Sequence, residues 1–233
     1  AFSFNSAFAV TINKANNTTP LSETGSWTGG VVPQSGDIAA FSSVNTASST
    51  PVTIGTGVGF LGIAYSDNPA TNPTINTGTA GTLTLGASGI DLSAGSRTLT
   101  FGTTVSLGAD QTWTTGTAAA NTSQLVANAV ISGSGKLTIN GTTGSPHSPV
   151  YLNAANTFTG GVAINSGASV RLGSAAPAFA LDLPTASVLG TGNLAINGGT
   201  IFGGGGAAIA PSTVTVTGDF GLNVGISSLN GRF

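Results

Sequence analysis

The residues that could carry acid–base chemistry are few in this 233-residue chain, and they are widely separated. A carbohydrate-cleaving site needs two carboxylates on one face, and the best available pair is Asp91 and Asp110, nineteen positions apart. Roles at turns and corners explain such an even spread better than a catalytic pair does. The acidic residues are Glu23, Asp37, Asp67, Asp91, Asp110, Asp182 and Asp219. We therefore expect a protein that is not an enzyme, with no catalytic residue and no cofactor.

Metal and phosphate sites are also poorly represented. His147 is the one histidine, it lies in the turn-rich stretch Gly144–Pro149, and the chain has no cysteine. The glycine strings Gly55–Gly59 and Gly203–Gly206 lack the Gly-Lys-Ser/Thr of a phosphate-binding loop, so they are expected to form flexible turns. With only five basic residues, binding to nucleic acid through phosphate contacts is not expected.

The composition is that of a folded chain with an almost uncharged surface. Charged residues make up 5% of the chain and hydrophobic residues 39%, and the net charge is −2. So little charge provides little repulsion between copies, and close association is expected. The absence of Met, even at position 1, suggests a chain whose signal peptide has been removed, and therefore a secreted protein. No apolar run is long enough to span a bilayer.

Short alternating runs bounded by Gly, Asn or Ser dominate the chain, and helical periodicity is nearly absent. This pattern predicts an all-β fold built from many short strands. The runs cover residues 82–85, 97–101, 104–107, 124–127, 136–139, 150–152, 169–172, 193–196 and 213–216.

Repetition favours one all-β architecture. The phrase Gly135–Thr142 recurs as Gly192–Thr200, and Gly81–Gly86 is a shorter version. A strand–turn phrase that recurs without cysteines or metal ligands is typical of a β-solenoid, in which each coil buries its inward face on its neighbours. Asn and Thr at equivalent corners can stack as ladders. A β-sandwich is the alternative that this pattern leaves open.

One stretch resembles a known family. Asn156–Gly173 reads Asn-Thr-Phe-Thr-Gly-Gly, then a short strand, a glycine turn and a second strand, and it resembles the autotransporter-associated β-strand repeat. The family's Asn-Gly-Gly-Thr turn follows at Asn197–Thr200, after an insert, Ala175–Pro184, that we expect to loop out. Trp27–Gly30 is similar to the start of secreted bacterial proteins that carry these repeats. The resemblance implies an exported bacterial β-solenoid (β-helix) with a structural or adhesive role, and it transfers no catalytic residue.

The first twelve residues alternate between apolar and polar side chains, as in one long strand. We expect residues 1–12 to form an extended N-terminal strand, a candidate donor arm, and residues 13–233 to form a single β-solenoid domain. A second alternating segment near the C-terminus is the candidate receiving groove. The predicted subunit-interface residues are Phe2, Phe4, Phe8, Val10 and Ile12 in the arm, and Phe220, Leu222, Val224 and Ile226 in the groove.

These features together predict a secreted structural subunit. Its copies would join end to end by β-strand addition into an extracellular filament or biofilm-matrix fibre, since neither end of the sequence shows a capping helix or charged loop. In the competing interpretation, residues 1–12 form the first coil of their own solenoid. The alternative function is a monomeric adhesin stalk that binds surface polysaccharide. The expected partners are therefore copies of the chain itself and, in the second case, a glycan.

Overall fold

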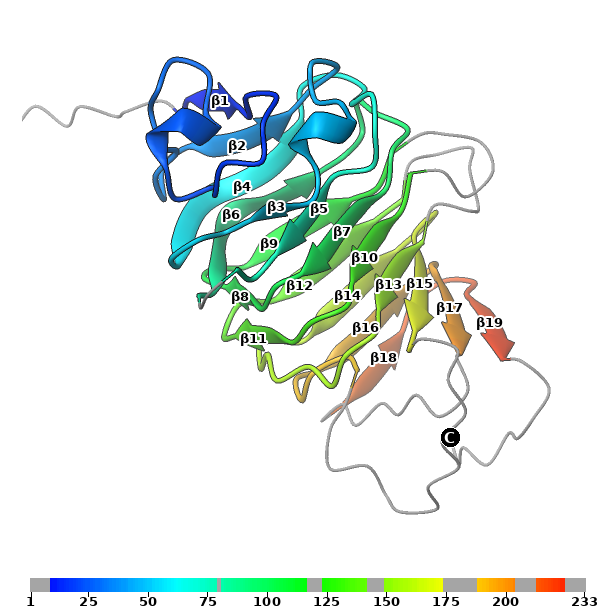
Figure 1. The fold of residues 1–233 in the computed structure, drawn as a ribbon. Helices are drawn as coiled ribbons and strands as arrows, with labels where there is room; N and C mark the ends of the chain where they lie inside the picture. Colours follow the sequence, from blue (N-terminus) through cyan, green and yellow to red (C-terminus); the bar gives the residue numbers. More distant parts are fainter. Residues whose placement is uncertain are drawn as a thin grey trace, which may run out of the picture.

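The computed structural model describes residues 9–78, 81–116, 123–141, 149–173, 188–203 and 213–224. Figure 1 shows successive coils of chain stacked along one axis, each contributing short strands to two sheets. All strand pairs are parallel, and the described residues contain no α-helix. The predicted all-β solenoid is therefore confirmed, and the β-sandwich alternative is excluded because its sheets are antiparallel.

The two sheets run the length of the stack. The first sheet contains, in spatial order, β1 (Thr11–Asn13), β2 (Ile38–Phe41), β4 (Val58–Tyr65), β6 (Leu83–Asp91), β9 (Gln111–Thr114), β12 (Leu137–Asn140), β14 (Val162–Asn165), β16 (Leu194–Asn197) and β18 (Val214–Val216). Beside this path, β8 (Val105–Leu107) pairs with β6 and β11 (Ile131–Gly133) pairs with β8. The second sheet contains β3 (Val52–Thr53), β5 (Thr74–Asn76), β7 (Leu99–Gly102), β10 (Leu125–Ala127), β13 (Val150–Leu152), β15 (Ser169–Leu172), β17 (Thr200–Gly203) and β19 (Gly221–Val224). Each predicted run of alternating residues overlaps one of these strands.

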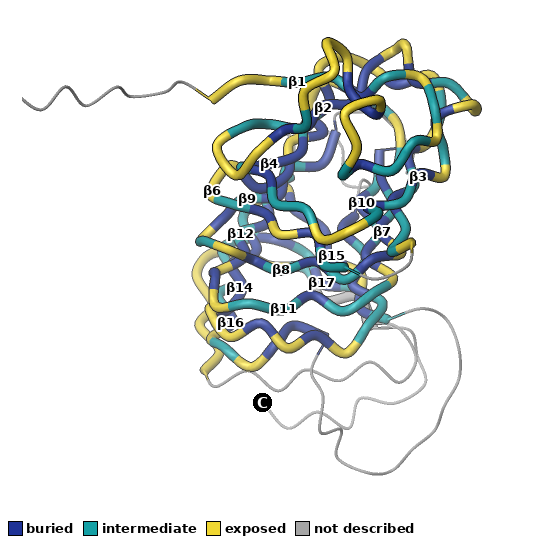
Figure 2. The backbone as a smooth tube through the Cα atoms, turned by 60° about the vertical axis from the view of Figure 1, so that its left-hand side comes forward, coloured by how far each residue is buried: buried dark blue, intermediate teal, exposed yellow. Residues whose placement is uncertain are grey.

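Inward-facing apolar side chains stack in columns because neighbouring strands keep one register. In the first sheet Ile139 pairs with Ile164, and Ile164 pairs with Ile196. All three side chains are buried. A slip of one residue would turn every such side chain to the solvent, so the column fixes the register of each coil. Figure 2 shows that buried stretches run through the stack, while exposed stretches gather at corners and in the N-terminal loops.

Polar ladders form at the corners, as the sequence predicts. Asn165 Nδ2 donates to Asn140 Oδ1 at 2.7 Å, and Asn197 Nδ2 donates to Asn165 Oδ1 at 3.0 Å. In the next coil, at the same corner, the Thr217 hydroxyl donates to Asn197 Oδ1 at 2.8 Å. A chain of amides in one register satisfies side-chain groups between coils without any charge.

Glycine takes part in strands as well as in turns. The string Gly55–Gly59, expected to form a flexible turn, runs into β4, which begins at Val58. Gly161 has a φ of +86°, and a Cβ at this position would lie 2.5 Å from the carbonyl oxygen of Asn193. This residue therefore needs glycine both for its backbone angle and for the close approach of the next coil.

The second sheet is covered at the N-terminal end, contrary to the expectation that neither end is capped. After β1 the chain passes through the 3₁₀ helix η1 (Thr24–Ser26), while a second one, η2 (Ala47–Ser49), lies further along. The Leu21 amide donates to Thr53 O at 2.8 Å, so this segment lies along the outer edge of β3. The Trp27 indole donates to Leu21 O at 2.8 Å and packs edge-on against Phe60. Sequence inspection missed this cap because its helical turn is only three residues long.

The boundary between arm and solenoid also requires correction. Thr11 and Ile12 lie in β1 and pair with Ile38 and Ala39 of β2 in the same chain. Because Ile12 packs against the core, the last residues of the expected arm belong to the solenoid itself. Residues 1–8 lie outside the described residues, so a donated arm is restricted to the residues that precede β1.

The buried amide of Asn156 gives a test of the packing between coils. Its Oδ1 accepts from Ile131 N at 2.8 Å, its Nδ2 donates to Val188 O at 2.6 Å, and its side chain is 2% exposed. We expect Asn156→Ala to lower the free energy of unfolding by about 2–3 kcal/mol, because two buried backbone groups lose their partners. Urea unfolding would measure this loss. Thr56→Ala, at an exposed loop position, is the control and should be nearly neutral; equal effects would contradict the assignment.

Candidate assembly interfaces at the ends of the solenoid

The fold does not bring the candidate acid pair together. Asp91 lies level with Thr114 at the end of β9, whereas Asp110 directly precedes β9. The two acids are therefore separated by the length of that strand, about 13 Å. Asp91 Oδ1 accepts from Ser93 N at 2.9 Å, and Asp110 Oδ1 accepts from Lys136 N at 2.8 Å. Both carboxylates accept hydrogen bonds from backbone amides at corners of the coil.

No group of metal-ligating side chains forms among the described residues either. His147, the glycines 204–206 and the insert Ala175–Pro184 lie outside the described part of the chain. Across the same described ranges, no helix has the length and apolar character needed to cross a bilayer. The features that remain to be explained are the two ends of the stack and one outward-facing aromatic column.

The predicted interface residues lie at opposite ends of the solenoid wherever the structure describes them (Figure 1). Val10 and Ile12 are at the N-terminal end, at the edge strand β1. Phe220 precedes β19 at the C-terminal end, and the backbones of Leu222 and Val224 lie in β19. Phe2, Phe4, Phe8 and Ile226 lie outside the described residues. The described residues of the predicted arm and of the predicted groove thus lie at opposite ends of the fold.

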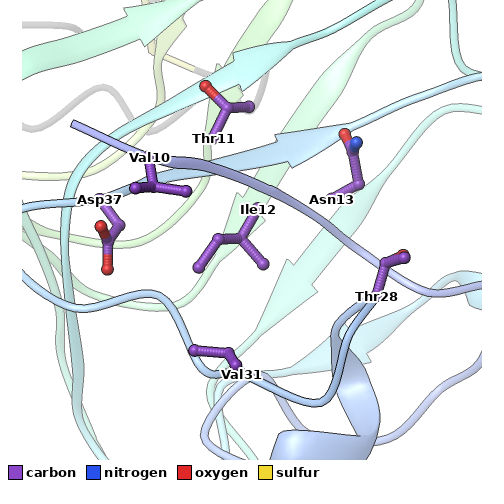
Figure 3. Close-up of a pocket in the computed structure, with 7 residues that line it drawn as sticks. All are labelled: Val10, Thr11, Ile12, Asn13, Thr28, Val31 and Asp37. Carbon is purple, nitrogen blue, oxygen red and sulfur yellow. The ribbon is translucent and has the colours of Figure 1, made fainter. Parts of the chain in front are cut away.

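A groove of about 430 Å³ runs along the outer side of β1. Figure 3 shows Val10 and Ile12 pointing into it from one side of the strand, with Val31 opposite, while Thr11 and Asn13 point to the other side. Val10 is 54% exposed and Val31 is 57% exposed. The remaining lining residues are Thr28 and Asp37. The groove therefore presents aliphatic side chains to solvent beside a strand edge.

The backbone of β1 has one paired edge and one open edge. Val10 O accepts from Ile38 N at 2.8 Å, and Lys14 N donates to Ala40 O at 2.8 Å. Since successive residues of a strand direct their amide and carbonyl groups to opposite edges, those of Thr11 face away from β2. None of the described residues hydrogen-bonds them. Further along, Thr28 N donates to Asn13 O at 2.9 Å, so the open edge ends there.

A buried lysine holds the cap beside this edge. The Lys14 side chain is completely buried, and Nζ donates to Ala15 O at 2.9 Å, Asn17 O at 2.7 Å and Asn17 Oδ1 at 2.9 Å. Three acceptors match the three hydrogens of an ammonium group. Burial nevertheless lowers the pKa of Lys14 from 10.5 to about 8, because removal from water penalises the charged form.

The C-terminal end of the first sheet exposes residues at inward-facing positions. Val214 pairs with Leu194 and Val216 pairs with Ile196. Leu194 and Ile196 are buried, but the two valines are 52% and 45% exposed. They occupy core positions in a final coil that no further described coil covers. Phe220, in the turn that leads to β19, is 42% exposed.

An aromatic column lies on the outward face of the second sheet. Tyr151 pairs with Arg171, and Arg171 pairs with Phe202. The Arg171 guanidinium carbon lies 5.6 Å from the centre of the Tyr151 ring and 5.0 Å from that of the Phe202 ring. Both rings are half-buried and Arg171 is exposed. Sequence inspection missed this column because its members come from three different coils. By contrast, Trp27, Tyr65 and Trp113 are buried core residues.

Comparisons of the chain with protein-family models, with curated proteins and with solved structures find no match. Function must therefore be argued from the two ends of the stack and from its outward faces.

The lowered pKa of Lys14 gives a pH-dependent test of the cap. Between about pH 8 and the ordinary lysine value, the unfolded chain binds a proton that the folded chain has released, so stability rises with pH. We expect the free energy of unfolding to rise across this window in the wild type and not in Lys14→Met, as measured by urea unfolding at about pH 7, 9 and 10. Lys136→Met removes an exposed lysine and should keep the rise. Parallel pH profiles of the wild type and Lys14→Met would contradict this assignment.

Proposed function

We propose that this protein is a secreted structural subunit whose copies join end to end, by β-strand addition from the N-terminus, into an extracellular filament or matrix fibre. The observation that carries the proposal is that, among the described residues, the terminal strands of the first sheet have unpaired outward-facing backbone groups, at Thr11 of β1 and at Val214 and Val216 of β18. Unpaired strand edges template pairing with another chain unless they are covered. The role is structural, and it uses no cofactor.

The separation of the two ends favours pairing between copies over pairing within one copy. Eight strand spacings of about 4.8 Å place β18 roughly 38 Å from β1. Pairing with β2 holds β1 at the N-terminal end of its own solenoid. The strand therefore cannot reach β18 of the same chain, and a neighbouring copy is the available acceptor.

The geometry of such a contact decides the form of the assembly. The N-terminal end of one copy meets the C-terminal end of the next, which is a head-to-tail contact that leaves one free end of each kind. Contacts of this type propagate into open filaments unless a rotation closes them into a ring. Burial of Phe2, Phe4 and Phe8 in a neighbour would contribute on the order of 5–8 kcal/mol before the cost of association.

The composition is consistent with an assembly outside the cell. The chain has no cysteine and a net charge of −2, so the stacking of coils depends on backbone pairing and apolar columns. Exposed polar groups are largely hydroxyls and amides, which repel other copies little. Extracellular or cell-surface localisation remains part of the proposal.

Removal of the arm tests this function. We expect deletion of residues 1–9 to abolish filaments in negative-stain images and to leave a folded monomer in sedimentation. The deletion stops before β1, because removal of Thr11 and Ile12 would also damage the solenoid. A chain with Phe2, Phe4 and Phe8 changed to Ser keeps the arm's length and should assemble at least about tenfold less well. Filaments of undiminished length from the deleted chain would refute the proposal.

A second function, that of a monomeric adhesin stalk, is favoured by the Tyr151–Arg171–Phe202 column. Half-buried aromatic rings held rigid beside a guanidinium can stack on sugar rings, while the cation pairs with an acidic sugar. This column lies on the lateral face of the shaft, across β13, β15 and β17, so glycan binding there would not require polymerisation. The partner would be a polysaccharide that contains uronic acids.

A glycan-binding titration tests the adhesin function. If the column binds glycans, Tyr151→Ala combined with Phe202→Ala should weaken binding to alginate about tenfold in a pull-down titration, because both stacking surfaces are lost. Val126→Ala changes an outward residue of the same column, one coil earlier, and is the control. Equal binding by the double variant and the control would dismiss the adhesin function.

A further inference from the structure

We propose that β1 of one copy pairs in parallel with β18 of the next copy, with Thr11 level with Thr215, so that the first sheet continues through the junction. This inference rests on the proposed end-to-end assembly and specifies its register. It also names the acceptor as β18, the terminal strand of the first sheet, instead of the segment around β19.

Side-chain columns give the first argument. Starting from Ile12, the register of the first sheet passes through Ala39, Ile63, Ile90, Trp113, Ile139, Ile164 and Ile196 to Val216. Ile12 and Val216 are thus the two ends of one inward-facing column. Placing Thr11 beside Thr215 sets Ile12 on Val216 and the exposed Val10 on the exposed Val214. The apolar column then continues from copy to copy without a break.

Backbone polarity gives the second, independent argument. At the β16–β18 pair, Leu194 N donates to Thr213 O, and Thr217 N donates to Ile196 O. The amide and carbonyl groups of Val214 and Val216 therefore face the outer edge of β18. At β1 it is Thr11 that faces outward. In a parallel ladder with this register, Thr11 N donates to Val214 O and Val216 N donates to Thr11 O.

A shift of one residue fails both criteria. It would direct the Thr11 groups toward residues whose amides and carbonyls are already paired with β16, and it would set Thr11, not Ile12, on the apolar column. A shift of two residues again pairs outward-facing backbone groups and inward-facing side chains. It leaves one of the two exposed valines without a partner. The register with Thr11 beside Thr215 satisfies the hydrogen bonds and covers both valines.

The corner ladder limits the length of the contact. Its side-chain hydrogen bonds run from Asn140 through Asn165 and Asn197 to Thr217 within one copy. In the proposed register Asn13 of the neighbour comes level with Thr217, but its carbonyl oxygen already accepts from Thr28 N of its own chain at 2.9 Å, and its Oδ1 accepts from Ser66 Oγ at 2.9 Å. The strand pairing at the junction is therefore confined to Val10–Ile12 on one side and Val214–Val216 on the other.

The shape of the N-terminal groove accommodates the same contact. Val214 and Val216 would lie next to Val10 and Ile12, with Val31 at the side of the groove. In the second sheet, Leu21 and Ser22 already cover β3, so the neighbour's β19 meets this cap and not an open strand. The free pairing edge at the N-terminal end is therefore confined to the first sheet, and this selects β18 as its partner.

Engineered cysteines test the register directly, because the chain has no cysteine of its own. The Thr11→Cys chain is mixed with the Thr215→Cys chain, assembled and oxidised, and covalent dimers are measured on a non-reducing gel. Paired residues of parallel strands have Cα atoms about 4.8 Å apart, within disulfide range. Thr213→Cys is the matched control, since it changes the same residue type two positions earlier, immediately before β18. Its Cα would lie roughly 8 Å from that of Thr11, which is too far to bridge.

The expected result is abundant dimer from Thr11→Cys with Thr215→Cys, and about tenfold less with Thr213→Cys. Filaments are imaged in the same samples. Filaments with no dimer, or with more dimer from Thr213→Cys, overturn the register and leave end-to-end assembly standing. Dimers that appear only after residues 225–233 are deleted would mean that the chain's own C-terminal segment occupies this edge, and would overturn the inference. The absence of both filaments and dimers refutes the inference and the proposed function together.

Discussion

Parallel backbone pairing between successive coils is the constraint on which the rest of this structure depends. Each coil must present its amides and carbonyls in the register set by the coil before it, so apolar side chains fall into columns and corner amides into ladders. In the first sheet such pairing engages both edges of the described strands that lie between β1 and β18. Among the described residues it leaves unpaired groups at β1 and β18, and the ends of the stack are therefore where we propose that copies associate.

The two ends of the stack differ in how far their strand edges and apolar side chains are covered. At the N-terminal end a cap held by Lys14 and Trp27 covers β3 in the second sheet and leaves only a short edge of β1 open. At the C-terminal end, inward-facing valines of β18 are about half exposed. The low charge, the exposed apolar column at one end and the open strand edge at the other support the proposed joining of unlike ends.

Individual strands could be predicted from the sequence more readily than their places in the coil. The alternating runs 136–139 and 193–196 became β12 and β16, in matching register on either side of β14. The similar phrase Gly81–Gly86 occupies a different side of the coil, where its strand pairs with β8. Local alternation of apolar and polar residues indicates that a strand forms. Long-range pairing decides which strand lies beside it. Residues of the aromatic column are 20 and 31 positions apart, so no local pattern indicated it.

The sequence by itself determined the class of fold. Alternating short runs and frequent glycine predict an all-β fold, because alternation and turn chemistry act over a few residues, and the recurring strand–turn phrase favours a solenoid over a sandwich. Only the tertiary structure decided that Thr11 and Ile12 belong to the solenoid, that Lys14 is buried in a cap, and that Ile12 and Val216 end one column. These placements depend on how each strand pairs with the next, from β1 to β18. No short segment of sequence encodes that series of pairings.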